Sequence, residues 1–128
     1  MNKLIIDVAS EKVFLMIITK DDIYNITKEN TKINYEKLIL IVKDFLYSNS
    51  LKLGDISKIY VNGGPGSFAG IRNSLSMVKA INVARKIDYY CFSFNDFKGQ
   101  SGIKYEDIPN LCDKFKIKKN LIKPIYLS

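Results

Sequence analysis

The residues best placed to do chemistry form a glycine-rich segment, with four glycines in the eight positions from Gly63 to Gly70. Glycine tolerates positive φ and lets the backbone approach a ligand closely. If a helix follows such a loop, its free N–H groups and its dipole favour an anion, and Arg72 adds positive charge. The segment therefore predicts a phosphate site or, alternatively, a tight turn that fixes how the next helix packs. Its candidate residues are Gly64, Pro65, Gly66, Ser67, Phe68, Gly70 and Arg72.

The spacing of this segment differs from those of two well-known nucleotide-binding loops. A Walker-type loop ends in Gly-Lys-Ser/Thr, whereas this chain has Gly70-Ile71-Arg72 at that place. The stretch from Gly64 to Ala69 fits the dinucleotide pattern GxGxxG/A, but that pattern requires an acidic residue at the end of the next strand. Asp88 lies at the start of that strand instead, so neither standard loop is predicted.

The side chains needed for metal-dependent or acid–base catalysis are scarce. The chain has no histidine, which removes the commonest general base and metal ligand. Asp7 and Glu36 could contribute to a two-metal nuclease site, but Asn62 stands where another carboxylate is needed. Cys91 and Cys112 form no CxxC pair and are predicted to be reduced core residues. We therefore predict no metal site and no cofactor.

The charge balance bears on what the chain could bind. Twenty Lys and Arg residues face 13 Asp and Glu, for a net charge of +7. Such an excess suits RNA or an acidic protein partner. A composition rich in Lys, Ile, Asn and Tyr gives the same excess without any selection for binding. No apolar run is long enough for a signal peptide or a membrane span, so a cytoplasmic protein without membrane contact is expected.

Hydropathy patterning predicts the elements that position these residues. Strands are expected at residues 3–8, 12–19 and 22–27, with Ser10-Glu11 and Lys20-Asp21 as the turns between them. A helix follows, for which Asn34 is the predicted N-cap and Gly54 lies beyond the end. Its apolar face recurs every three or four residues, at Leu38, Ile41, Val42, Phe45 and Leu46.

Later elements complete an α/β pattern. A strand at 56–61 leads into the glycine-rich segment, a helix follows at about 73–86, and another strand is expected at 89–94. Residues 105–115 are a further candidate helix. The order β-β-β-α-β-α-β, with right-handed crossovers, predicts the ribonuclease-H-like layout of the actin-like ATPases. Ile39 and Leu40 lie off the apolar face of the first helix, so either the rest of the domain or a partner is expected to cover them.

One segment also resembles a known family signature. Gly64-Pro65-Gly66-Ser67-Phe68-Ala69-Gly70-Ile71-Arg72 is similar to the Gly-Pro-Gly-Ser-Phe-Thr-Gly-Leu/Ile-Arg motif of the TsaB (YeaZ) family. Leu4-Ile5-Ile6-Asp7 resembles that family's opening strand, and Pro124-Ile125-Tyr126-Leu127 its usual ending. Departures from the pattern include Val8 and Ala9 for Thr-Ser, Ala69 for Thr and Ser128 for Arg.

Most of the second lobe usual in that family is also missing. The resemblance thus implies one ribonuclease-H-like domain over 1–128, with a core at about 1–98 and a C-terminal helix and tail at 99–128 in place of that lobe. Asp7 would be a vestigial phosphate or metal position. A nucleotide-binding phosphotransferase-like or nuclease-like lobe of the same fold remains the alternative.

The resemblance also implies a function and partners. The chain would be a non-catalytic subunit in the formation of N6-threonylcarbamoyladenosine (t6A) in tRNA. It would pair with a catalytic TsaD-type subunit, assisted by a TsaE-type ATPase, and reach tRNA indirectly through the complex; a homodimer is left open. The expected interface lies on the first two helices, at Leu38, Ile39, Leu40, Val42, Leu46, Met77, Ala80, Ile81 and Ala84.

Overall fold

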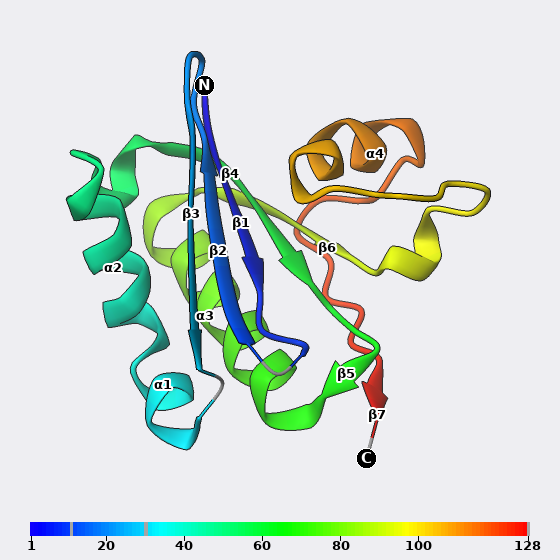
Figure 1. The fold of residues 1–128 in the computed structure, drawn as a ribbon, viewed down its shortest axis with the longest axis horizontal. Helices are drawn as coiled ribbons and strands as arrows, with labels where there is room; N and C mark the ends of the chain where they lie inside the picture. The colour runs from blue at the N-terminus through cyan, green and yellow to red at the C-terminus, as the bar shows by residue number, and fades with distance from the viewer. Residues whose placement is uncertain (11, 30, 128) are drawn as a thin grey trace.

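A five-stranded mixed sheet organises the chain in the computed structural model, which describes residues 1–10, 12–29 and 31–127 (Figure 1). The sheet order is β3-β2-β1-β4-β6. β1 pairs antiparallel with β2, and β2 with β3, whereas β4 runs parallel to both β1 and β6. The strands are β1 (Asn2–Asp7), β2 (Lys12–Ile18), β3 (Ile23–Glu29), β4 (Ile56–Asn62) and β6 (Asp88–Phe92).

These strands agree with the sequence prediction within two residues at each end. The antiparallel meander followed by parallel strands confirms the predicted ribonuclease-H-like layout. Glu11, assigned to the first predicted turn, lies outside the described residues. A short second sheet joins β5 (Gly66–Ser67) to β7 (Tyr126–Leu127) in parallel.

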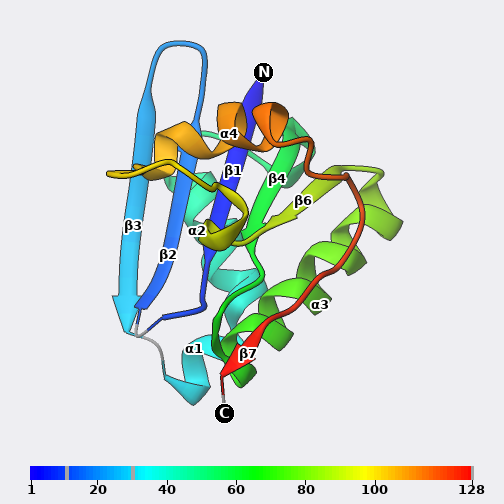
Figure 2. The ribbon, with the colours of Figure 1, turned by 90° about the vertical axis from the view of Figure 1, so that its right-hand side faces the viewer.

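Both faces of the sheet are covered at its inner strands, which explains the nearly continuous apolar runs of β1 and β2, whereas the edge strand β3 is mostly exposed. Leu4 and Ile6 of β1 belong to one core cluster, and Ile5 between them belongs to the other. The first cluster is covered by α2 (Leu38–Ser48) and α3 (Phe68–Arg85), and the short helix α1 (Lys32–Glu36) packs against both helices. The second is covered by a segment containing α4 (Ile108–Lys114), on the opposite side of the sheet (Figure 2).

Two predicted helix starts are wrong. Asn34 does not cap α2 but lies inside α1, where its backbone N–H donates to the Thr31 hydroxyl at 3.2 Å. The helix is interrupted by a turn at Lys37, and α2 begins at the next residue. Helix α3 begins at Phe68 rather than near residue 73, because Ser67 caps it by accepting from the N–H of Gly70 at 3.3 Å. The glycines predicted a loop through this stretch, but the capping hydrogen bond of Ser67 allows the helix to begin within it.

The C-terminal part covers the remaining face and one edge of the sheet. A 3-10 turn (Tyr105–Asp107) leads directly into α4, so the helix predicted at 105–115 is divided in two. The following residues, 117–127, form an extended C-terminal strap that runs beside the edge of β6 and along α3 (Figure 2). Asn120 anchors the strap, because its N–H donates to the carbonyl of Tyr89 at 2.7 Å.

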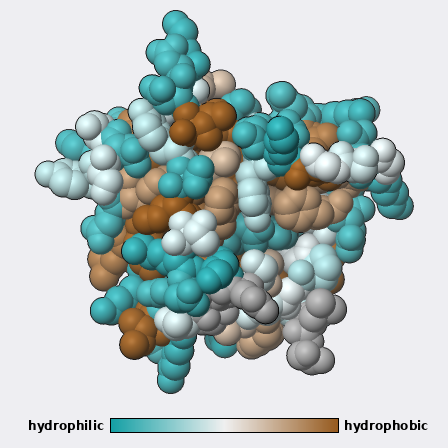
Figure 3. Space-filling model, viewed as in Figure 1, coloured by the Kyte–Doolittle hydropathy of each residue, from teal (hydrophilic) through white to brown (hydrophobic). Residues whose placement is uncertain are grey.

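The surface and the thiols complete the description. On the face seen in Figure 1, hydrophobic patches lie among hydrophilic side chains (Figure 3). Cys91 and Cys112 are free and buried. Burial, followed by the charge of Asp113, raises the pKa of the Cys112 thiol to about 12. No helix in the described part of the chain is both long and apolar enough to span a bilayer.

Candidate functional site

The glycine-rich loop lies between β4 and α3, beneath the C-terminal strap. The N–H of Gly63 donates to the Phe92 carbonyl at 2.7 Å, and its own carbonyl accepts from the N–H of Ile125 at 2.7 Å. On the other side, the N–H of Ser67 donates to the carbonyl of Ala9 at 2.9 Å. The loop is therefore held between the strap and the segment that follows β1.

Glycine is required here because other chain segments approach so closely. Gly64 has φ of +117°, and a Cβ at this position would collide with the carbonyl oxygen of Ile125. A Cβ on Gly66 would collide with the carbonyl of Ala9. These contacts favour the tight-turn interpretation, in which the glycines set the position of α3.

Few backbone donors in this loop are left for an anion. Five of its N–H groups already donate to protein oxygens, at Gly63, Gly64, Gly66, Ser67 and Gly70. A phosphate cradle depends on N–H groups that point outward and unpaired. The geometry therefore gives the predicted phosphate site little support, although Phe68 and Arg72 remain exposed at the start of α3.

Asp7 is also occupied by the protein itself. Its side chain lies at the end of β1 and is only 4% exposed. One carboxylate oxygen accepts from the N–H of Ala9 at 3.0 Å, and the other accepts from the Tyr105 hydroxyl at 2.6 Å. Burial, and then the charge of Asp7, raise the pKa of that hydroxyl, so it remains a donor. Tyr105 thus covers the position where a phosphate or metal was considered.

The carboxylates considered for a nuclease do not form a site. Asn62 uses its side-chain oxygen to accept from the N–H of Gly64 at 2.9 Å. Glu36 is on α1, at the rim of a groove on the helical side of the sheet. Across the described residues, no group of three or more Cys, Asp or Glu side chains is arranged to hold a metal ion.

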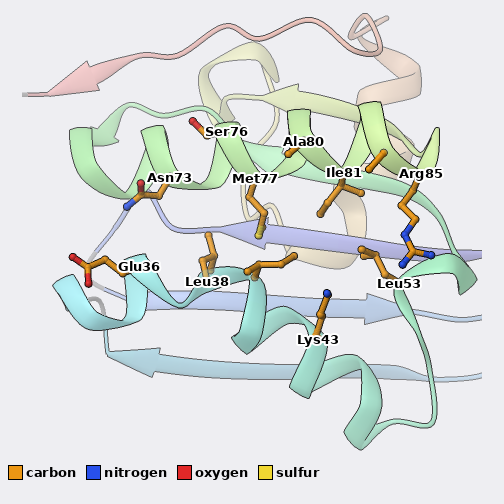
Figure 4. A pocket seen from close by; sticks show the side chains of 12 residues that line it. Glu36, Leu38, Lys43, Leu53, Asn73, Ser76, Met77, Ala80, Ile81 and Arg85 are labelled. Atoms are coloured by element: carbon orange, nitrogen blue, oxygen red, sulfur yellow. The ribbon is translucent and has the colours of Figure 1, made fainter.

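An open groove with a volume of about 550 Å³ lies between α1, α2 and α3, at the predicted interface (Figure 4). Its middle is apolar, and charged side chains from Glu36, Lys43 and Arg85 lie at its margin. The groove is lined by Glu36, Leu38, Ile39, Lys43, Leu53, Asn73, Ser76, Met77, Ala80, Ile81, Ala84 and Arg85.

Most residues of the predicted interface gather at this groove. Ala80 and Ala84 are exposed on α3, and Met77 and Ile39 are half-buried. Leu38 and Ile81 form the floor, with 2% and 5% of their surfaces exposed. Leu40 points outward on α2 and is 55% exposed, although it does not line the groove.

Two residues of the predicted interface are corrected. Val42 and Leu46 are completely buried in the core and do not line the groove. Both lie on the stripe of α2 that packs on the sheet, so a partner cannot reach them in this fold. Helical periodicity predicted an apolar stripe on α2, but it does not determine which residues of that stripe face the sheet and which face outward.

Neither the contact of Tyr105 with Asp7 nor the contacts of the strap could be predicted from the sequence. Tyr105 lies 98 residues from Asp7, and its ring stacks on Phe14 with centroids 4.0 Å apart. No local pattern connects positions so distant in the chain. The resemblance of Pro124-Ile125-Tyr126-Leu127 to a known ending marked the strap as notable but did not reveal that it packs on the glycine-rich loop.

The chain resembles known proteins both in sequence and in fold. No family model matches the sequence. Two relatives, each named "tRNA threonylcarbamoyladenosine biosynthesis protein TsaB", come from Buchnera aphidicola of Schizaphis graminum and of Baizongia pistaciae. They are 26% identical over 90 residues and 28% identical over 75 residues. These matches cover 70% and 59% of this chain, but only 43% and 34% of the relatives.

The fold comparison agrees with the sequence matches. A solved structure, YeaZ from Pseudomonas aeruginosa, superposes with a TM-score of 0.66 at 20% identity. The superposition covers 72% of this chain and 43% of that one. The matches to this chain therefore span less than half the length of the curated relatives.

Proposed function

We propose that this chain belongs to the TsaB (YeaZ) family and is a non-catalytic partner subunit in the formation of threonylcarbamoyladenosine in tRNA. The relatives' names supply the pathway. The partner would be a catalytic subunit of the TsaD type, with a TsaE-type ATPase assisting the pair. The chain would therefore contribute a docking surface rather than reacting groups.

The open groove of α1, α2 and α3 is the observation that carries this proposal. A monomer rarely leaves a hollow apolar surface uncovered unless something binds there. Exposed Ala80 and Ala84 let another helix approach α3 closely, while the flexible side chain of Met77 can adapt to that helix and Ile39 adds apolar surface. Two helices from a partner would complete a four-helix arrangement with a mostly aliphatic seam.

The non-catalytic part of the proposal has separate support. Tyr105 occupies the Asp7 carboxylate, and the N–H groups of the glycine-rich loop are largely used within the protein. A phosphotransferase or nuclease would need these groups free for a nucleotide or a metal. No observation favours either alternative function.

Co-purification from the native host tests the proposal. A tagged chain should retain the TsaD-type subunit, and cells depleted of the chain should lose threonylcarbamoyladenosine from their tRNA. Ala80→Arg places an unpaired charge at the centre of the groove and should abolish both retention and rescue. Val83→Arg is the matched control, because it adds the same charge to α3 at a side chain that is 68% exposed outside the groove.

The controls separate lost docking from lost folding. Both variants should keep the circular dichroism spectrum and melting temperature of the wild type, because both positions are exposed. The proposal is wrong if folded Ala80→Arg retains the TsaD-type subunit and restores the modification as well as Val83→Arg does.

A further inference from the structure

Two segments without acidic residues lie far apart in the sequence. No Asp or Glu occurs between Asp55 and Asp88, and none occurs after Asp113. The first segment includes all of α3, and the second includes the C-terminal strap. Both segments carry several Lys or Arg residues, so any surface they share must be strongly positive.

The structure places α3 and the strap side by side (Figure 2). At one end, the rings of Phe68 and Tyr126 meet with centroids 4.8 Å apart. Near the other end, the side chain of Asn82 donates to the side-chain oxygen of Asn120 at 3.3 Å. The strap therefore follows α3 along most of its length, and the two acid-free segments form one surface.

Helical geometry places Arg72 and Lys79 of α3, and Lys86 directly after its end, on one side, whereas Arg85 lies at the margin of the groove. Arg72, Lys79 and Lys86 recur every seven residues, and seven residues complete almost two turns. All three side chains are exposed, and successive members are about 10 Å apart along the axis at 1.5 Å per residue. Exposed Lys119 and Lys123 extend the row onto the strap. We call these five residues the basic face.

Little negative charge compensates this face. Within the described part of the chain, Lys119 pairs with Asp88 at 3.6 Å. Asp88 also accepts from the side chain of Asn120, and this hydrogen bond, more than Lys119, lowers its pKa. The basic face therefore meets solvent as a row of cations about 20 Å long, estimated from the helical rise.

We propose that the basic face binds the sugar-phosphate backbone of RNA. A row of separated cations matches a chain of phosphates, and such contacts give affinity without sequence preference. Exposed aromatic rings at one end favour RNA over an acidic polypeptide, because unpaired bases stack on such rings. Phe68 is 51% exposed and Tyr126 is 42% exposed, with the Arg72 guanidinium 6.0 Å from the Phe68 ring.

The basic face and the groove use different sides of α3. The groove is lined by Asn73, Met77, Ala80 and Ala84 of α3. At about 100° per residue, the basic face lies at other angles around the same helix. A protein docked in the groove therefore leaves the basic face open. The inference deepens the proposed function, on which it rests for the identity of the RNA: this chain holds the tRNA directly while the catalytic subunit acts on it.

Fluorescence anisotropy of the full chain with an unmodified tRNA transcript tests the inference. Neutralising about five phosphates predicts that log K falls with log salt at a slope of about −3.5 to −4.5. Lys79→Glu/Lys123→Glu should weaken binding at least tenfold at low salt. Lys20→Glu/Lys28→Glu changes the net charge equally at the β2–β3 hairpin and should weaken binding less than threefold.

Several results would overturn the proposal. Equal weakening in the two double variants would show that net charge, rather than this face, attracts RNA. Undiminished binding by Lys79→Glu/Lys123→Glu would also reject it. Displacement of the tRNA by poly-glutamate at equal charge concentration would identify the face as a site for acidic protein instead.

The same variants keep this inference separate from the proposed function. Lys79→Glu/Lys123→Glu should still pair with the TsaD-type subunit, and Ala80→Arg should lose that pairing while still binding tRNA. If Lys79→Glu/Lys123→Glu no longer pairs with the TsaD-type subunit, the basic face is not separate from the docking surface. If Ala80→Arg still pairs, the groove is not the docking surface.

Discussion

Replacing Tyr105 by Phe tests whether the C-terminal segment seals the Asp7 position. The substitution removes one hydroxyl and keeps the ring that stacks on Phe14. The lost hydrogen bond is 2.6 Å long and ends on a carboxylate that is 4% exposed, so water cannot easily replace the donor. Hydrogen bonds to charged groups contribute about 1.5–3 kcal/mol, which is the expected loss in the free energy of unfolding.

Thermal and urea denaturation measure that loss. For a chain of this size each kcal/mol lowers the melting temperature by roughly 3–5 °C, so a fall of about 5–15 °C is expected. Tyr47→Phe is the matched control, because Tyr47 is 82% exposed and its change should stay within about 0.5 kcal/mol. A Tyr105→Phe variant as stable as Tyr47→Phe would refute the claim that this hydroxyl holds the buried carboxylate.

The remaining predictions concern the loop, the thiols and nucleotides. Gly64→Ala should lower the free energy of unfolding by more than about 3 kcal/mol, because the position has positive φ and a Cβ there would collide with the strap. Gly99→Ala, which has positive φ but open space around it, should cost about 1 kcal/mol in the same urea titration. Cys91 and Cys112 should resist iodoacetamide at pH 8 until the protein unfolds, because burial raises both thiol pKa values and lowers the thiolate fraction; rapid native labelling, detected by mass spectrometry, would contradict this. Calorimetry with ATP and magnesium should detect no micromolar binding, since Asp7 already has its partners, and a saturable isotherm would restore the phosphotransferase hypothesis.

Much of the fold follows from local patterns. The strands were predictable because alternation and apolar runs report burial directly, and the order of elements then limits the topology. The helix starts were less predictable, because a single cap can override neighbouring propensities. Ser67 begins α3 within a glycine-rich stretch, and Thr31, rather than Asn34, supplies the capping contact at α1.

The candidate site depended on long-range packing that no local pattern encodes. Helical periodicity grouped Val42 and Leu46 with Leu38, but only the packing of α2 on the sheet separates the buried pair from the groove floor. The glycine-rich loop was equally compatible with an anion and with a tight turn. The strap favours the tight turn, because its backbone N–H and carbonyl groups form hydrogen bonds with the backbone of the loop near Gly63.

The central claim is that the groove of α1, α2 and α3 is a docking surface for the catalytic subunit. Its most direct test is the dissociation constant between this chain and its host's TsaD-type subunit, measured for wild type, Ala80→Arg and Val83→Arg. An unpaired charge buried at the groove centre should weaken binding at least 100-fold, about 2.8 kcal/mol, while the same charge at exposed Val83 should change it less than threefold. Equal dissociation constants for the three folded proteins would contradict the account.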